Sequence, residues 1–379
     1  MCTRKPWLIA TLPQCLFVVT LSLGALMTGV RHRSVAAPAW PSFSDPQPIK
    51  AQEAILNAFD KYRAVALGEA HQLLEEHDFL QSLIRNPAFP AKVNDIVVEC
   101  GNALYQELLD RYIAGPDVPL AEVRQVWRNT TQSPSGPWNA LVYEQLFTTV
   151  REVNGKLPPE KRLRVLAGDP PIDWKKVESR SDAMMFLSQR DSHFASVVEQ
   201  QVLAKQRKAL LIIGTGHLFK AQPRLMRPAV RMLKTPGVAA GPPPPSPPPS
   251  LQPSPGIRYG NVTALLEEHY PGATLVITPH TGFGNFTPEL KHLNAELEPR
   301  LGAWPRPSLA FIKDTWLGAL DAATIFPGII GPDGQLQNPY AGLRVAEMVD
   351  AYYTLAPRIL SPGPILLQRR SRIKPTWQS

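Results

Sequence analysis

Five apolar segments of this 379-residue chain each run directly into a polar residue that could do chemistry. The first segment leads to both Glu69 and His71, and the other four lead to Glu99, Asp169, His217 and His280. In open parallel sheets, ligands bind beyond the carboxyl ends of the strands, where the loops converge. We therefore expect these carboxylates and imidazoles to lie together at one rim. General acid–base catalysis and divalent-metal binding both use such a set.

Each of these residues has an ordinary structural explanation when it is taken alone. A Glu or His after a strand is most often a helix cap or a solvated loop residue. Apolar strands that all end in polar residues are harder to explain this way, because burying polar groups costs free energy. Gly68 and Gly214 open two Gly-x-x-His turns, and glycine lets the backbone approach a ligand closely. The joint pattern favours a functional rim.

Other residues of the same chemical types fit structural roles better. Cys100 follows Glu99, and because neighbours on a strand face opposite sides of a sheet, we expect Cys100 to face the core. Glu75 could share the face of His71 one helical turn later, or belong to an ordinary charged first turn. Four histidines on expected helices fit surface or packing positions: His77, His193, His269 and His292.

The elements that must position the rim alternate between strand-like and helix-like segments. The expected strands are 62–67, 95–99, 163–167, 209–213 and 273–278, with a weaker sixth at 348–353. Helical spacing is clear before Gly115 and before Asn154-Gly155. Such alternation predicts an α/β fold, with a largely parallel sheet of five to six strands and helices on both faces.

The domain organisation follows from three unusual segments. Residues 241–255 are rich in proline, which cannot donate to a sheet or continue a helix, so we expect a surface loop or, alternatively, a domain linker. Residues 361–379 form a basic tail. We favour one α/β domain over residues 40–360, because the part after the proline-rich loop supplies too few strands for its own core.

The N-terminal residues 1–39 have the pattern of an export signal. A basic start precedes an apolar stretch over residues 7–30, and small residues near 34–39 suit cleavage. The alternative is an uncleaved anchor, since the stretch is long enough to cross a bilayer. We therefore expect an exported protein, periplasmic or extracellular, with a membrane tether if the segment stays. Cleavage would leave Cys100 as the sole cysteine, so the fold would not depend on a disulfide.

The net charge of +8 does not indicate nucleic-acid binding. The chain has 40 basic and 32 acidic residues, but eight of the basic residues lie at the two ends of the chain. The remaining body has as many basic as acidic residues, which leaves no excess of positive charge to follow phosphates. The expected partner is a small-molecule or peptide substrate.

The paired Gly-x-x-His motifs, with Glu99 between them and Arg190-Asp191 before the second, resemble a known superfamily. It joins Tiki-type metalloproteases, erythromycin esterases and ChaN-like haem-binding proteins, and the likeness spans roughly residues 62–280. The form Gly-Glu-x-His is most similar to the ChaN-like haem-uptake branch. The paired histidines that typically follow there are replaced by residues 72–76, Gln-Leu-Leu-Glu-Glu.

Each branch implies a different chemistry for the rim. The esterase-like branch implies His71 as general base, oriented by Glu69 and Glu99. The Tiki-like branch implies a divalent metal, Mn, Co or Zn, on His71, Glu99 and His217. The ChaN-like branch implies haem, for which the histidine candidates are His71, His217 and His280.

We expect foremost an exported hydrolase that cleaves an ester or amide, with a haem- or iron-binding protein as the alternative. A third alternative is an interaction protein that uses the proline-rich loop, with a vestigial rim. The expected catalytic residues are Glu69, His71, Glu99, Asp169, Arg190 and His217.

Overall fold

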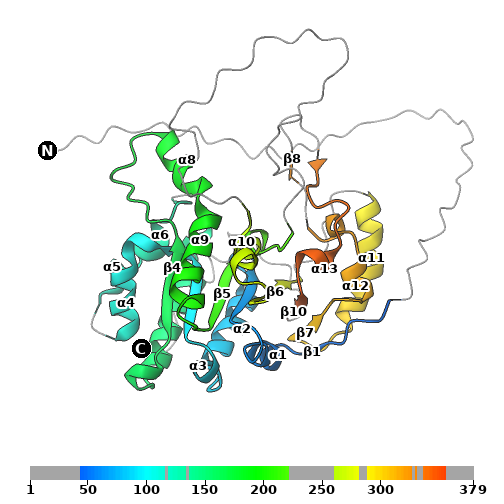
Figure 1. Cartoon of the computed structure of the whole chain (residues 1–379), viewed down its shortest axis with the longest axis horizontal. Helices are drawn as coiled ribbons and strands as arrows, with labels where there is room; N and C mark the ends of the chain where they lie inside the picture. The colour runs from blue at the N-terminus through cyan, green and yellow to red at the C-terminus, as the bar shows by residue number, and fades with distance from the viewer. Residues whose placement is uncertain are drawn as a thin grey trace, which may run out of the picture. The chain divides into compact units, whose positions relative to one another are not determined.

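The structure is a computed structural model of the full chain (Figure 1). It describes residues 43–115, 118–133, 136–221, 260–280, 288–326, 329–330 and 336–355. By its contacts the chain divides into two units, Met1–Trp40 and Pro41–Ser379, and all described residues belong to the second. The expected export segment, proline-rich loop and basic tail lie outside the described residues, and the domain bounds stay a prediction.

The centre of this unit is an eight-stranded sheet with the order β1-β7-β10-β6-β2-β5-β3-β4. The six strands from β10 to β4 pair in parallel, whereas β7 is antiparallel to both β10 and β1. The strands are β1 (Ile49–Lys50), β2 (Ala64–Glu69), β3 (Asp95–Asn102), β4 (Arg164–Asp169), β5 (Ala209–Gly214), β6 (Thr274–Pro279), β7 (Ser308–Phe311) and β10 (Ala351–Thr354). A separate pair joins β8 (Ile329–Ile330) to β9 (Leu336–Gln337).

The predicted α/β class and the five stronger strands are confirmed, but the sheet has eight strands and not five to six. The expected sixth strand begins later, at Ala351, because Val345–Met348 forms a short helix. The strands β1 and β7 have two and four residues. A two-residue segment cannot show a period of two, and the four residues of β7, Ser-Leu-Ala-Phe, do not alternate between polar and apolar side chains.

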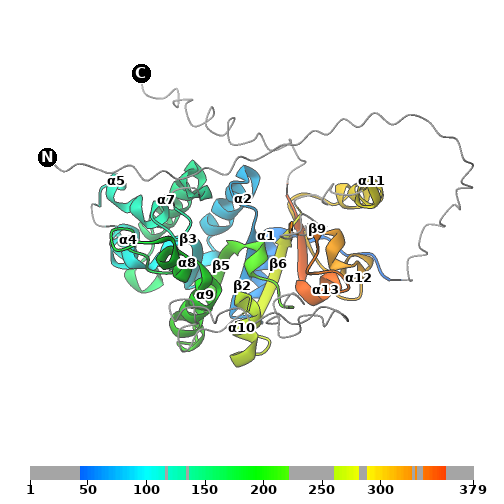
Figure 2. The same ribbon diagram turned by 90° about the horizontal axis from the view of Figure 1, so that it is seen from above.

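Helices cover both faces of the sheet, as Figure 2 shows with α2 and α7 on one side of the strands and α9 and α10 on the other. The longer helices are α1 (Ala51–Ala58), α2 (Leu74–Arg85), α4 (Gln106–Ala114), α7 (Leu141–Asn154), α8 (Arg180–Ser188), α9 (Arg190–Val198), α10 (Val262–His269) and α11 (Pro288–Gly302). Single-turn helices are α3 (Phe89–Lys92), α5 (Leu120–Val123), α6 (Gln125–Arg128), α12 (Trp316–Ala319) and α13 (Val345–Met348). Within the described part of the chain, none of the helices has both the length and the apolar character that a membrane crossing needs.

Side-chain alternation along the strands decides which helices each residue meets. Val65 and Leu67 of β2 belong to the hydrophobic cluster that also contains side chains of α1, α2, α4 and α7. Cys100 belongs to the same cluster and is buried, which confirms that it faces the core. Glu99, its neighbour on β3, therefore faces the opposite side of the sheet, toward α9.

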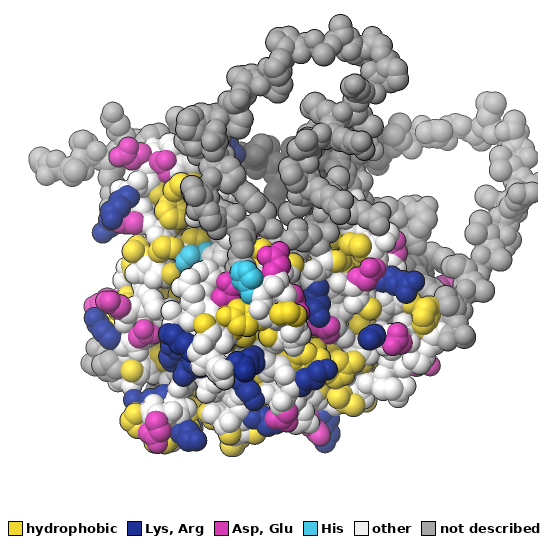
Figure 3. Space-filling view, in the orientation of Figure 1, with side chains coloured by type: hydrophobic (Ala, Val, Ile, Leu, Met, Phe, Trp, Pro, Cys, Tyr) yellow, Lys and Arg dark blue, Asp and Glu magenta, His cyan; other side chains and the backbone are white. Residues whose placement is uncertain are grey.

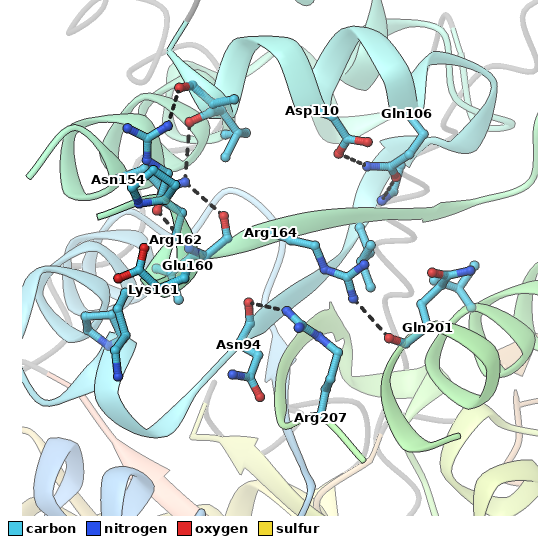
Figure 4. A pocket seen from close by; sticks show the side chains of 18 of the residues that line it. Asn94, Gln106, Asp110, Asn154, Glu160, Lys161, Arg162, Arg164, Gln201 and Arg207 are labelled. Carbon is cyan, nitrogen blue, oxygen red and sulfur yellow. Dashed lines mark hydrogen bonds between the residues drawn. The ribbon is translucent and has the colours of Figure 1, made fainter. Parts of the chain in front are cut away.

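The outer edge of β4 is closed by side-chain amides. Gln106 donates to the carbonyl of Val165 (2.8 Å) and accepts from the amide of Ala167 (2.7 Å), and Asn154 makes the same pair of bonds with Leu163 (2.8 Å each). Both amides line a groove of about 970 Å³ beside β4, which Figure 4 shows at close range. These amides take the place of a neighbouring strand.

Candidate active site

Four adjacent strands of the sheet, β2, β5, β3 and β4, supply the predicted rim. Glu69 ends β2, Glu99 lies near the end of β3, and Asp169 ends β4, while His217 follows β5 by three residues. The contacts described below join these residues to His71 and Arg190 in one continuous network. Because β5 lies between β2 and β3, the loops after all three strands meet above Gly214, the last residue of β5.

The first half of the site is a carboxylate and an imidazole from the β2 loop. His71 Nδ1 lies 3.4 Å from Glu69 Oε2. Burial alone would lower the pKa of His71, but the charges of Glu69 and Glu99 outweigh it and raise the pKa above the ordinary value. Burial would likewise raise the pKa of Glu69, yet its histidine contacts lower it to about 2. Glu69 is thus an ionised carboxylate next to Nδ1 of His71, and it stabilises the protonated form of that imidazole.

Two more side chains fix Glu69 from the helical layer. Tyr143 of α7 donates its hydroxyl to Glu69 Oε1 (2.7 Å), and His77 Nε2 of α2 lies 3.1 Å from the same oxygen. His77 is fully buried, so it packs as the sequence predicted, but it also binds the site. Trp138 packs edge-on against the His71 ring with the centroids 4.8 Å apart. The orientation of the His71–Glu69 pair is therefore set by buried groups.

Glu99 is the centre of the site and is fully buried. Its Oε1 lies 4.0 Å from His71 Nε2 and 3.6 Å from His217 Nε2, and it accepts a hydrogen bond from Arg190. Its Oε2 accepts from the amide of Gly214 (2.5 Å). Glu99 Oε1 thus faces the Nε2 atoms of both imidazoles. The Nδ1 atoms, on the opposite side of each ring, face other carboxylates.

The second half of the site repeats the first with different residues. His217 Nδ1 is hydrogen-bonded to Asp191 Oδ1 at 2.5 Å. Burial would lower the pKa of His217, but Asp191 and Glu99 outweigh it and raise the pKa. Phe194 packs edge-on against the His217 ring. Asp191 is the first acidic residue of α9, so the helix that covers this face also supplies the partner of His217.

Arg190 binds two carboxylates of the site, Asp169 and Glu99. It is 6% exposed, donates through Nε to Asp169 Oδ1 (3.2 Å) and through Nη2 to Glu99, and its Nη1 lies 3.5 Å from His217 Nε2. Asp169 also accepts two hydrogen bonds from Thr131, both 2.7 Å. Burial raises the pKa of Asp169 to about 6, against the lowering effect of Thr131 and Arg190. Arg190 is therefore part of the buried network and not a surface arginine.

A cavity of about 490 Å³ opens beside the two imidazoles, within the usual size range of small-molecule sites. Glu69, His71 and His217 line one side of it. Figure 3 shows histidine side chains next to acidic ones near the upper margin of the described surface, with basic and acidic side chains mixed over the rest of that face. The predicted residues thus border a space large enough for a substrate.

His280 lies apart from this group. Its Nδ1 is 2.9 Å from the Tyr352 hydroxyl, its Nε2 is 3.0 Å from Glu298 Oε2, and it is not among the residues that line the cavity. Both ring nitrogens face hydrogen-bonding partners, so His280 does not fit the role of a haem ligand that the resemblance implied.

The sequence prediction missed several contributors. Glu76, and not Glu75, supports the His71 loop: it accepts from the amide of Ala70 (2.8 Å) and from the Tyr353 hydroxyl (2.7 Å). Burial and the charge of Glu69 raise the pKa of Glu76 well above its ordinary value. The contacts of Tyr143, Thr131 and His77 with the site were not predicted from the sequence either. Among these contributors, Asp191 alone was indicated by the sequence, because it follows Arg190 directly.

The metal-binding hypothesis for His71, Glu99 and His217 finds a poor donor set. Arg190 already donates to the Glu99 oxygen that faces both imidazoles, and the Gly214 amide takes the other oxygen. A cation there would have to displace the guanidinium and meet its positive charge. Over the described residues, no three His, Cys, Asp or Glu side chains gather as a metal-binding group. The residues present fit an arginine-centred site better than a metal centre.

No family model matches the chain, and no curated protein matches it in sequence. Several solved structures match at low identity. They include a Bacillus cereus protein (11% identity, TM-score 0.46, 82% of this chain and 94% of that one) and a succinoglycan biosynthesis protein (11%, 0.48, 82% and 94%). A mutant of the erythromycin esterase EreC in its open conformation also matches (12%, 0.45, 80% and 92%). These likenesses are too remote to transfer an activity to this chain.

Proposed function

We propose that this chain is a hydrolase that cleaves an ester or amide with a water molecule activated by His71. One observation carries the proposal: two imidazoles, each held at Nδ1 by its own carboxylate, face the same Glu99 oxygen with their Nε2 atoms beside a cavity. Paired histidine–carboxylate units are suited to moving two protons in one reaction, one from water and one to a leaving group.

In the first step, neutral His71 takes a proton from water at Nε2 while the water oxygen bonds to the substrate carbonyl carbon. Glu69 accepts from Nδ1–H and stabilises the imidazolium that forms, since its own pKa of about 2 keeps it ionised. The carbonyl π electrons move to its oxygen, which becomes an oxyanion. The buried guanidinium of Arg190 adds positive charge to this side of the site.

In the second step, the tetrahedral intermediate collapses and the bond to the leaving group breaks. Protonated His217 donates its Nε2 proton to the departing oxygen or nitrogen. Asp191 favours the cation of His217, which suits a general acid. Proton return from His71 to His217 restores both groups for the next cycle. Glu99, between the two Nε2 atoms, stabilises both cations and holds the rings in register.

The experiment is a screen of the purified chain against uncharged esters and anilides, with and without prolonged chelation. We expect hydrolysis that survives chelation. Abolition by chelation and recovery with Mn²⁺, Co²⁺ or Zn²⁺ would contradict the arginine-centred mechanism and favour the metal alternative. A saturable Soret band on haemin titration, lost in His71→Ala, together with no hydrolysis of any substrate, would contradict the hydrolase and favour haem binding.

We also propose that the protein acts outside the cytoplasm after removal of residues 1–39. The support is the basic start, the apolar stretch and the small residues that follow it. N-terminal sequencing of the protein recovered from its native host tests this. A mature start near residue 37 to 40 is the expected result, and an intact start in the membrane fraction would show a tether instead.

A further inference from the structure

The cavity beside the imidazoles has an aromatic wall made by Phe219, Phe326 and Tyr340. The Phe219 and Phe326 rings pack 4.3 Å apart, and Tyr340 packs edge-on against both, at 5.1 and 6.1 Å. Phe219 and Phe326 are almost fully buried. Three rings from two distant parts of the chain thus line the same space as the proposed catalytic pair.

Asn338 holds this wall in place. Its side chain donates to the carbonyl of Phe326 (3.0 Å) and accepts from the amide of Tyr340 (3.0 Å). The following turn is fixed as well, because Asp321 accepts from the amide of Gly342 (2.8 Å). These bonds connect the backbone of both residues, and the contacts between the rings add to them, so the wall is formed without a ligand.

The wall lies on the His217 side of the cavity. Phe219 follows His217 by two residues on the same loop, and its ring packs directly against Tyr340 and Phe326. In the mechanism above, His217 gives its proton to the leaving group. The group that departs from the carbonyl is therefore the part of the substrate nearest the three rings.

The charge of the cavity lining restricts what this group can be. No Lys or Arg is among the described residues that line it, and Glu69 contributes a full negative charge. The histidines, the sole cationic groups in that lining, are paired with carboxylates. A phosphate or carboxylate on the leaving group would lose its hydration there without gaining an unpaired cation.

We infer that the cavity binds an apolar, uncharged leaving group, an alcohol or amine with a ring or branched chain, against Phe219, Phe326 and Tyr340. This inference rests on the proposed hydrolase and names its substrate class. Rings of this kind gain from burial and from contact with aromatic faces. The substrate is then the ester or amide of such a group.

The test compares three acetate esters with the same acyl group: ethyl acetate, 2-phenylethyl acetate, and the latter with a carboxylate on its ring. Acetate release is measured and normalised to uncatalysed hydrolysis. We expect kcat/KM for 2-phenylethyl acetate to exceed both others at least about tenfold. Phe326→Ala and Tyr340→Ala should reduce this preference, the ratio of the two kcat/KM values, to within about threefold.

Phe311→Ala is the matched control, because Phe311 is 46% exposed on β7 and does not line the cavity. It should keep the wild-type preference. Circular dichroism checks that each variant is folded. If the wild type does not discriminate among the three esters, or if both wall variants keep the preference, the inference is overturned and the hydrolase stands.

A binding assay separates the inference from the hydrolase. The neutral fluorescent probe N-phenyl-1-naphthylamine should bind the wild type and Phe311→Ala, and should bind Phe326→Ala at least about fivefold more weakly. If no ester or amide is cleaved, this loss would still support an apolar site while the hydrolase fails. Equal binding to wild type and both wall variants would overturn the apolar site.

Discussion

Gly214 stands so close to His71 that a Cβ atom on it would lie 2.9 Å from His71 Cε1. The same atom would lie 2.9 Å from Glu99 Oε2, which accepts the Gly214 amide. Separations under 3 Å between such atoms are not tolerated, so a neighbour would have to move. The second Gly-x-x-His turn thus begins with glycine because the imidazole of the first turn occupies the space of its side chain.

Gly214→Ala should therefore displace the His71 ring from Glu99 and lower kcat on the best ester at least about tenfold, since an error of about 1 Å in a catalytic group is costly. Gly302→Ala is the control, because nothing lies within 4 Å of its Cβ position and it is not among the residues that line the cavity. It should leave kcat within about twofold. Equal rates in both variants would show that the ring position is unimportant.

Glu69→Gln tests what sets the pKa of the base. The carboxylate of Glu69 raises the pKa of His71, so its removal lowers that pKa. His71 acts as base when it is neutral, and the acidic limb of the kcat/KM profile should therefore move to lower pH. Rates measured from pH 4 to 9 provide the check. An acidic limb that stays in place would assign that limb to another group.

Asp191→Asn makes the complementary test on the acid. Asp191 raises the pKa of His217, so its loss lowers that pKa, and His217 gives up its proton at lower pH. The basic limb of the profile should move to lower pH and the acidic limb should stay. A shift confined to the acidic limb would reverse the assignment of acid and base.

Gln106→Ala should open the outer edge of β4. The change leaves the Val165 carbonyl and the Ala167 amide without their partner, which costs about 1–3 kcal/mol of unfolding free energy. An edge with unpaired amides can also add a strand from another molecule. Thermal unfolding should occur at lower temperature, and sedimentation should show association that grows with concentration.

The control for this edge is Gln200→Ala, since Gln200 is exposed and bonds only locally, to Ser196. It should unfold and sediment like the wild type. If Gln106→Ala behaves the same way, the side-chain amides do not protect the edge.

The rim could be predicted because its residues lie at or just after the ends of parallel strands. Apolar runs place Glu69, Glu99 and Asp169 at or near the ends of strands, and a parallel sheet brings strand ends together. His71 and His217 stood out through their matching Gly-x-x-His turns. The local sequence therefore predicts both the strand and the residue near which the strand ends.

The residues that hold the rim side chains in place could not be predicted in this way. Tyr143 and Thr131 reach Glu69 and Asp169 from helices and loops whose packing is decided by the whole fold. Glu76 and Glu75 are adjacent and chemically alike, and only the direction of the first turn of α2 selects between them. His280 follows β6 just as the others follow their strands, yet its ring nitrogens face Tyr352 and Glu298.

The role of His71 as the base is tested by the turnover of His71→Ala on the ester that the wild type cleaves best, after both proteins have been treated with a chelator. His71 is 34% exposed at the rim, so its loss should leave the circular dichroism spectrum and the unfolding temperature close to wild type. Removing the general base should lower kcat at least about 10²-fold. Near wild-type turnover in the folded variant would show that His71 is not the base.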